Sequence, residues 1–324
     1  MMRLTFSLLF LFGTLLFFSS CSKDDGSESV DLDTVIDVND SYFTAANSNI
    51  TVTIINCTLS NGTETTCYEI VTTSAPTDHE MGPWCPDNIA DDASAGGIWL
   101  EGGEVYDVDG AFVENMASFY NDDTWLMYDD NGDIYVTETE EDCINAANPN
   151  VGVAYQNFCV ECLPSYITDL TQTWVIPITP VMVSDQAFFA SGPGGPGSSV
   201  PSTRGIALNG IEYSAPAPVS NILAAYTLAP FDDAGGHINV NQGYHYHAAT
   251  GLSFSVEQSD GHAPLTGYAL DGHGIYSRLD TNGEEASDLD ECRGHYDDIR
   301  GYHYHLDEAG SNNFINCLHG AYPN

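Results

Sequence analysis

Residues 243–247 read GYHYH, and residues 301–305 read GYHYH again, in a chain of 324 residues that contains only ten histidines. The flanks match as well, because DDAGGHINVNQ precedes the first copy and DECRGHYDDIR precedes the second. Side chains on a β-strand alternate between its two faces, so each copy places two histidines on one face and two tyrosines on the other. The sequence therefore predicts an internal tandem repeat of two histidine-bearing strands, with units near residues 232–262 and 290–319.

The remainder of the chain has turn signals and strand-forming runs. Asn-Gly and Asp-Gly pairs recur, and such pairs tolerate the positive φ angles of tight hairpin turns. These pairs are residues 109–110, 131–132, 209–210, 271–272 and 282–283. Helical periodicity is scarce and predicts only short helices, at residues 140–147 and 221–228. We therefore expect a mainly β fold with few short helices, as a single disulfide-stapled domain over residues 41–324.

The N-terminus has the pattern of an export signal. The apolar run at residues 4–18 is shorter than the roughly 20 residues that cross a bilayer, and small residues follow it. Ser19-Ser20-Cys21 resembles a bacterial lipobox, in which the cysteine is lipidated and becomes the new N-terminus. The sequence predicts a lipoprotein signal peptide at residues 1–20, lipidation of Cys21 and a flexible tether at residues 21–40. Ordinary cleavage with an unmodified Cys21 is the alternative.

Charge and location restrict the partners. The formal net charge is −41 at pH 7, and such a surface repels phosphate backbones, which argues against nucleic-acid binding. We expect the protein to be extracytoplasmic at the outer membrane or cell surface, held to the membrane by the lipid on Cys21.

Eight further cysteines, an even number in an exported chain, predict four disulfides. Eight cysteines permit 105 pairings, and the one that we expect is Cys57–Cys67, Cys85–Cys143, Cys159–Cys162 and Cys292–Cys317. The CVEC spacing at residues 159–162 also fits a redox dithiol, but no βαβ pattern surrounds it, which favours a structural bridge.

The two copies and their surroundings resemble the YHYH family, a mostly extracytoplasmic group. The matching motifs are TDHEMGPWCP at residues 77–86, GIALNGIE at 205–212, GYALDGHGIY at 267–276, DLDECRGH at 288–295 and NCLHG at 316–320. His273 departs from the family's pattern, where an apolar aromatic residue is expected. The family carries no established activity to transfer, so the resemblance names a domain and no reaction.

The histidines predict a transition-metal site. If the repeats pack about a pseudo-twofold axis, His245, His247, His303 and His305 converge, with His237 and His295 as further ligands. Imidazole is the commonest metal ligand near neutral pH, and with the cysteines oxidised such a site favours zinc or copper. The acids expected to orient the ligating rings are Asp232, Asp233, Asp290 and Glu291. The secondary candidates are His262, His273, His319 and His79.

Other interpretations of the same residues stay open. Alternating tyrosine and histidine also makes a well-packed strand whose rings donate to backbone carbonyls, and metal-free acid–base catalysis is a third possibility. LDTNGEEASDLDE at residues 279–291 could hold calcium, although it lacks the spacing of an EF-hand loop and also fits a solvated acidic hairpin. The sequence does not separate a surface metal-binding module from a metal-dependent extracellular enzyme, such as a hydrolase or oxidoreductase.

Overall fold

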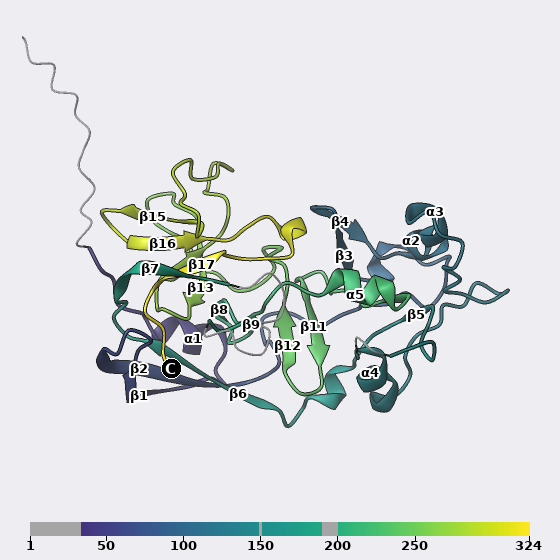
Figure 1. The fold of residues 1–324 in the computed structure, drawn as a ribbon, viewed down its shortest axis with the longest axis horizontal. Coiled ribbons are helices and arrows are strands. Elements are labelled where there is room, and N and C mark those ends of the chain that lie inside the picture. The colour runs from purple at the N-terminus through teal and green to yellow at the C-terminus, as the bar shows by residue number, and fades with distance from the viewer. Residues whose placement is uncertain (1–33, 149–150, 190–199) are drawn as a thin grey trace, which may run out of the picture. The chain divides into compact units, whose positions relative to one another are not determined.

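The computed structural model describes residues 34–148, 151–189 and 200–324. The predicted signal peptide, Cys21 and most of the predicted tether lie outside these residues. The described residues belong to one compact unit. This unit is mainly β with a few short helices, and that fold class is the one that the sequence predicts (Figure 1). No helix within the described residues is both long enough and apolar enough to cross a bilayer.

An eight-stranded sheet carries both GYHYH copies. Its strands in spatial order are β11 (Gly236–Asn239), β12 (Gly243–Tyr246), β9 (Glu212–Tyr213), β8 (Gly205–Ala207), β13 (Leu265–Ala269), β14 (Gly274–Tyr276), β16 (Gly301–His305) and β15 (Gly294–Asp297). The strand pairings follow the same order from either edge. From one edge, β11–β12 is antiparallel, β12–β9 is parallel and β9–β8 is antiparallel. From the other edge, β15–β16 is antiparallel, β16–β14 is parallel and β14–β13 is antiparallel. β8 and β13 pair antiparallel at the centre. The two halves of the sheet therefore have matching topology, and an internal duplication remains our interpretation of that symmetry.

The tyrosine face of each hairpin is attached to a turn of the same half-sheet. Tyr246 accepts a hydrogen bond from the Asn209 amide at 2.9 Å, and Tyr304 donates to the Asp271 carboxylate at 2.6 Å. Asn209 and Asp271 belong to the predicted Asn-Gly and Asp-Gly turns, whose glycines have φ of +89° and +86°. Because these partners are buried, the bonds fix which face of β12 and β16 carries tyrosine and which carries histidine.

The other strands form smaller sheets around this one. Their bounds are β1 (Thr51–Thr58), β2 (Glu64–Thr73), β3 (Ile98–Glu101), β4 (Glu104–Asp107), β5 (Phe158–Cys159), β6 (Thr171–Pro177), β7 (Met182–Phe188), β10 (Thr227–Leu228) and β17 (Cys317–Gly320). β1, β2 and β6 make one antiparallel sheet, and the remaining strands pair as β3 with β4, β5 with β10, and β7 with β17.

The helices are short, and two of them lie where periodicity predicts them. They are α1 (Ser41–Ala46), α2 (Gly110–Glu114), α3 (Met116–Phe119), α4 (Glu140–Ala146) and α5 (Val219–Ala224). Residues 109–110 do not close a hairpin. Asp109 instead caps α2, because its carboxylate accepts from the Phe112 N–H at 2.6 Å.

Four disulfides form, but two of the expected pairings are wrong. Cys57–Cys67 and Cys292–Cys317 are as predicted, whereas the other four cysteines pair as Cys85–Cys159 and Cys143–Cys162. Cys159 lies on β5 and Cys162 follows it in non-helical backbone. Three residues of extended chain span about 10 Å, which exceeds the roughly 7 Å limit for bridged Cα atoms. The two cysteines of CVEC therefore join different partners, which also argues against a redox dithiol there.

We expect the Cys85–Cys159 disulfide to stabilise the folded protein more than the Cys57–Cys67 disulfide does, because it closes a longer loop. Cys85–Cys159 closes a sequence separation of 74 residues, and Cys57–Cys67 closes one of 10. In the chain-entropy model, removing Cys85–Cys159 lowers the free energy of unfolding by about 2 kcal/mol more than removing Cys57–Cys67 does. Urea unfolding of the Cys85→Ser/Cys159→Ser and Cys57→Ser/Cys67→Ser variants measures this difference. Equal losses for the two variants would contradict it.

Candidate metal centres

Seven of the ten histidines gather in two separate groups. The four-histidine group consists of His262, His295, His303 and His305, and the three-histidine group consists of His237, His245 and His247. In each group, one ligand atom from every member lies within 4.8 Å of the ligand atoms of the others. In the described part of the chain, these two are the groups of three or more side chains suited to hold a metal ion.

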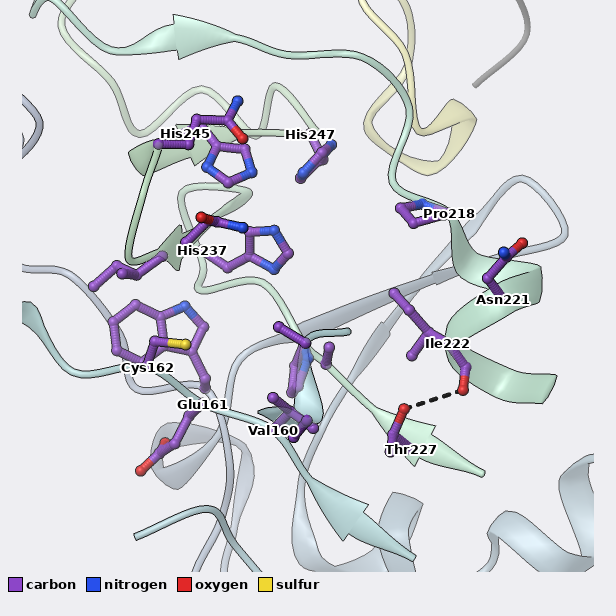
Figure 2. Close-up of a pocket in the computed structure, with 18 of the residues that line it drawn as sticks. Val160, Glu161, Cys162, Pro218, Asn221, Ile222, Thr227, His237, His245 and His247 are labelled. Carbon is purple, nitrogen blue, oxygen red and sulfur yellow. Dashed lines mark hydrogen bonds between the residues drawn. The ribbon is translucent and has the colours of Figure 1, made fainter. Parts of the chain in front are cut away.

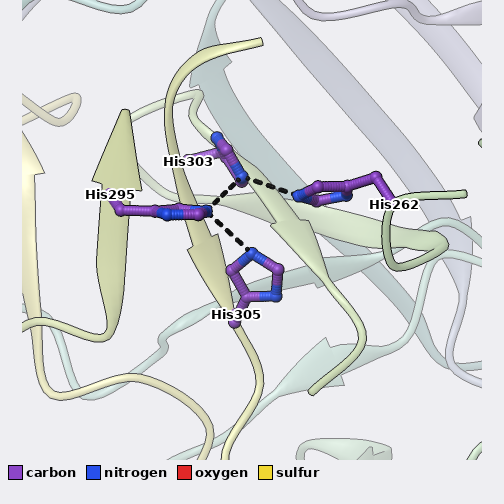
Figure 3. Close-up of side chains that lie close together, drawn as sticks. All are labelled: His262, His295, His303 and His305. Carbon is purple, nitrogen blue, oxygen red and sulfur yellow. Dashed lines mark hydrogen bonds between the residues drawn. The ribbon is translucent and has the colours of Figure 1, made fainter. Parts of the chain in front are cut away.

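The four-histidine group lies at the outer hairpin of the second half-sheet. His295 on β15 is opposite His303 on β16, His305 follows two residues later on the same face, and His262 comes from the segment before β13. The Nε2 atoms are 3.0 Å apart for His295–His303, 3.1 Å for His262–His303 and 3.2 Å for His295–His305. Figure 3 shows the four rings directed at one another from three segments of the chain.

The other nitrogen of each of these rings faces an oxygen atom. The Nδ1 acceptors for His262, His295, His303 and His305 are Ala263 O at 3.0 Å, Asp288 Oδ1 at 2.8 Å, Gly301 O at 2.9 Å and Ser277 O at 2.9 Å. Carbonyl and ionised carboxylate oxygens only accept hydrogen bonds, so Nδ1 carries the proton and Nε2 of a neutral ring does not. Where both rings of a contact are neutral, the close Nε2 contact therefore brings two lone pairs together.

Burial disfavours the charged form of three of these rings, His262, His303 and His305. Loss of hydration lowers the pKa of His303 to about 2 and that of His305 to about 4, and it also lowers the pKa of His262. At neutral pH a proton is therefore a poor counterpart for the converging lone pairs. This donor set could hold a metal cation.

The three-histidine group repeats this arrangement in the first half-sheet with one ligand fewer. His237 on β11 is opposite His245 on β12, and the centroids of the three rings are 4.8 to 4.9 Å apart. Nδ1 of His245 donates to Gly243 O at 3.0 Å, and Nδ1 of His247 donates to Ala215 O at 2.7 Å. Burial lowers the pKa of all three rings.

A cavity of about 290 Å³ adjoins the three-histidine group, and all three histidines line it. Figure 2 shows the histidines on one side of this cavity, with Ile222 and Asn221 of α5 across from them and Val160 below. Three protein ligands beside a cavity resemble catalytic zinc sites, which keep a fourth position open, whereas four ligands resemble closed structural sites.

The prediction that the four GYHYH histidines converge in one site is wrong. β12 and β16 are separated by β9, β8, β13 and β14 in the sheet. Five strand spacings of about 4.8 Å place the two pairs roughly 24 Å apart along the sheet. Each pair instead joins the histidine opposite it in its own hairpin, His237 or His295. The structure thus divides the predicted site into two.

The acids expected to orient the ligating rings have a different role. Asp232 accepts hydrogen bonds from the Tyr244 hydroxyl at 2.8 and 2.9 Å, and Asp290 accepts from the Tyr302 hydroxyl at 2.8 Å. Both acids therefore hold the tyrosine face, opposite the histidines. Asp233 and Glu291, the remaining pair, are exposed. Backbone carbonyls, together with Asp288 at His295, orient the rings instead.

Of the four secondary candidates, only His262 belongs to a group. The position of His262 after the first GYHYH copy suggests that it belongs to the first repeat. In the structure it instead joins the histidine group at the β15–β16 hairpin, and no local sequence signal indicates this. His79 lies between Asp78 and the Tyr244 hydroxyl, at 3.0 and 3.3 Å. The remaining two, His273 and His319, contact the tyrosine face at Tyr302.

The acidic stretch at residues 279–291 is organised by turns and ion pairs. Asp280 accepts from the Asn282 and Glu284 N–H groups at 2.8 and 2.9 Å, and Glu285 pairs with Arg293 at 2.6 Å. These contacts fit the solvated acidic hairpin, the alternative to a calcium loop.

Comparison with known proteins gives one match. Residues 173–288 match the model described as "YHYH protein", a span that includes the first GYHYH copy and ends before the second. No curated protein and no solved structure matches the chain. The match is narrower than the resemblance indicated by the motifs, which run from residue 77 to residue 320. The chain carries a YHYH protein family domain at residues 173–288.

Proposed function

We propose that this is an exported, lipid-anchored protein that binds two transition-metal ions, zinc or copper, one at each histidine group. The observation that carries the proposal is the convergence of Nε2 atoms in the four-histidine group. Tetrahedral zinc with Zn–N bonds of about 2.0–2.1 Å requires N···N separations of roughly 3.3–3.4 Å. The three Nε2···Nε2 separations in the structure, 3.0 to 3.2 Å, are close to that value.

A purely structural role for the histidines fits this geometry poorly. In a metal-free core, buried ring nitrogens are expected to face hydrogen-bond donors. In the four-histidine group, Nε2 faces Nε2, and each Nδ1 proton is already directed to an oxygen on the outside of the group.

Metal-dependent catalysis on an extracellular substrate is the second candidate function. The cavity beside His237, His245 and His247 favours it, because a metal with three protein ligands keeps a position for water or substrate. In this proposal, the four-histidine site holds its metal for structure or storage, and the three-histidine site is the reactive one.

Export and anchoring at Cys21 are part of the proposal. They are supported by the apolar segment followed by Ser-Ser-Cys in the sequence and by four disulfides, which persist in oxidising compartments.

If the two sites are independent, mutations in one histidine group should remove one metal ion and leave the other ion bound. Protein purified without chelators should contain close to two metal ions per chain. The His295→Ala/His303→Ala and His237→Ala/His245→Ala variants should each lose one of them, because each leaves the other group intact. Elemental analysis of the folded variants measures this, with His79→Ala as a control that keeps both ions. If both double variants keep all the metal of the wild type, the histidine groups are not the sites.

The histidines also predict a pH dependence for the metal-free protein. His305 has a folded pKa of about 4, below the value near 6.5 expected in the unfolded chain, so the unfolded state binds more protons between these values. Stability from this group is therefore lost as pH falls from about 6.5 to about 4, and His303 extends the loss to lower pH.

Carboxylates titrate in part of the same range, so the test compares two proteins. The Tm of wild type should fall more steeply with acid than that of His303→Gln/His305→Gln, whose amides do not titrate. Calorimetry of both metal-free proteins between pH 7 and pH 4 measures the difference. Parallel curves would show that the two imidazoles do not set the pH dependence.

Lipid anchoring predicts that Cys21→Ala releases the protein. Wild type should fractionate with membranes and incorporate labelled palmitate, whereas the variant should do neither because it lacks the acceptor sulfur. Cys57→Ser, which removes a disulfide cysteine, serves as the matched control and should stay labelled. Labelling of the Cys21→Ala protein would contradict the assignment.

A further inference from the structure

The wall of the cavity beside the three-histidine group is mostly apolar. Its apolar side chains come from several segments: Trp84, Val160, Ile222, Ala225, Pro230 and Ile238. Figure 2 shows α5 forming the side that faces the histidines. At about 290 Å³, the cavity is near the lower end of the range for small-molecule sites, about 300–1,000 Å³.

The cavity's charge disfavours an anionic occupant. Neither lysine nor arginine is among its lining residues, and the one ionisable acid there is Glu161. Burial raises the pKa of Glu161, which favours its neutral form. An anion entering this cavity would meet only the metal as a positive partner, in a chain whose net charge is −41.

Several polar groups of the wall are already bonded to the protein. The Trp84 indole N–H donates to Gly236 O at 3.0 Å, and the Thr227 hydroxyl donates to Ile222 O at 3.1 Å. Gln242 donates to Glu212 at 2.7 Å. Because no lysine or arginine lines the cavity, a bound metal would be its main cationic anchor for a ligand.

We propose that the cavity binds a neutral, largely apolar small molecule that coordinates the metal of the three-histidine site through one uncharged nitrogen or oxygen atom. The inference rests on the proposed function, since it requires a metal at His237, His245 and His247. It adds the chemical class of the ligand and assigns α5 to its recognition. The four-histidine site takes no such ligand, because four rings already fill a tetrahedral shell.

Cobalt(II), whose visible spectrum reports its ligands, provides the test. Protein loaded with cobalt is titrated at pH 8 with imidazole and with 4-phenylimidazole, two neutral donors that differ by one phenyl ring. We expect 4-phenylimidazole to bind tighter by about tenfold or more, because burying its ring removes apolar surface from water. The Ile222→Trp variant should lose this preference while binding as much cobalt as the wild type does.

Two further variants complete the experiment. Ala225→Phe narrows the cavity from a second position, in case Ile222→Trp fails to fold, and Ile54→Trp on β1 places the same bulky side chain at an exposed site. The inference is overturned if 4-phenylimidazole has no advantage in the wild type, or if the folded cavity variants keep that advantage. In either case, about two cobalt ions per chain would leave the proposed function standing. If the His237→Ala/His245→Ala variant binds as much cobalt as the wild type, the proposed function fails together with the inference.

Discussion

The hydrogen bond from histidine Nδ1 to a fixed oxygen is the interaction on which the candidate sites depend. In six of the seven clustered rings the acceptor is known, and in five of these it is a backbone carbonyl. The strand and turn geometry therefore selects the tautomer, and it leaves Nε2 unprotonated and directed at the neighbouring rings. Without these bonds, the rings could rotate or exchange tautomers and the lone pairs would not converge.

The opposite face of the same strands makes that geometry rigid. The tyrosines alternate with the histidines and bond to buried partners such as Asp271 and Asn209, so neither β12 nor β16 can shift register without breaking these bonds. Because the two half-sheets have matching topology, each contains a hairpin with histidines on one face and tyrosines on the other. The segment containing His262 supplies a fourth ring to the histidine group of the second half-sheet only. One chain thus combines a group of four histidines with a group of three that lines a cavity of about 290 Å³.

The sequence predicts the local features well and the long-range ones poorly. Strand alternation places His303 and His305 on one face, and the Asp271-Gly272 turn follows from its dipeptide. The order of strands in the sheet depends on pairings between distant segments, so the separation of the two GYHYH copies was not foreseeable. The same limit explains the exchanged partners of Cys85 and Cys143, since an even cysteine count leaves the connectivity open.

Anomalous diffraction at the zinc absorption edge, from crystals of protein purified without chelators and then loaded with zinc, tests the central claim most directly. The account predicts two anomalous peaks per chain. One should lie among the Nε2 atoms of His262, His295, His303 and His305, and the other should lie beside His237, His245 and His247. Well-ordered histidines with no anomalous peak at either group would contradict it.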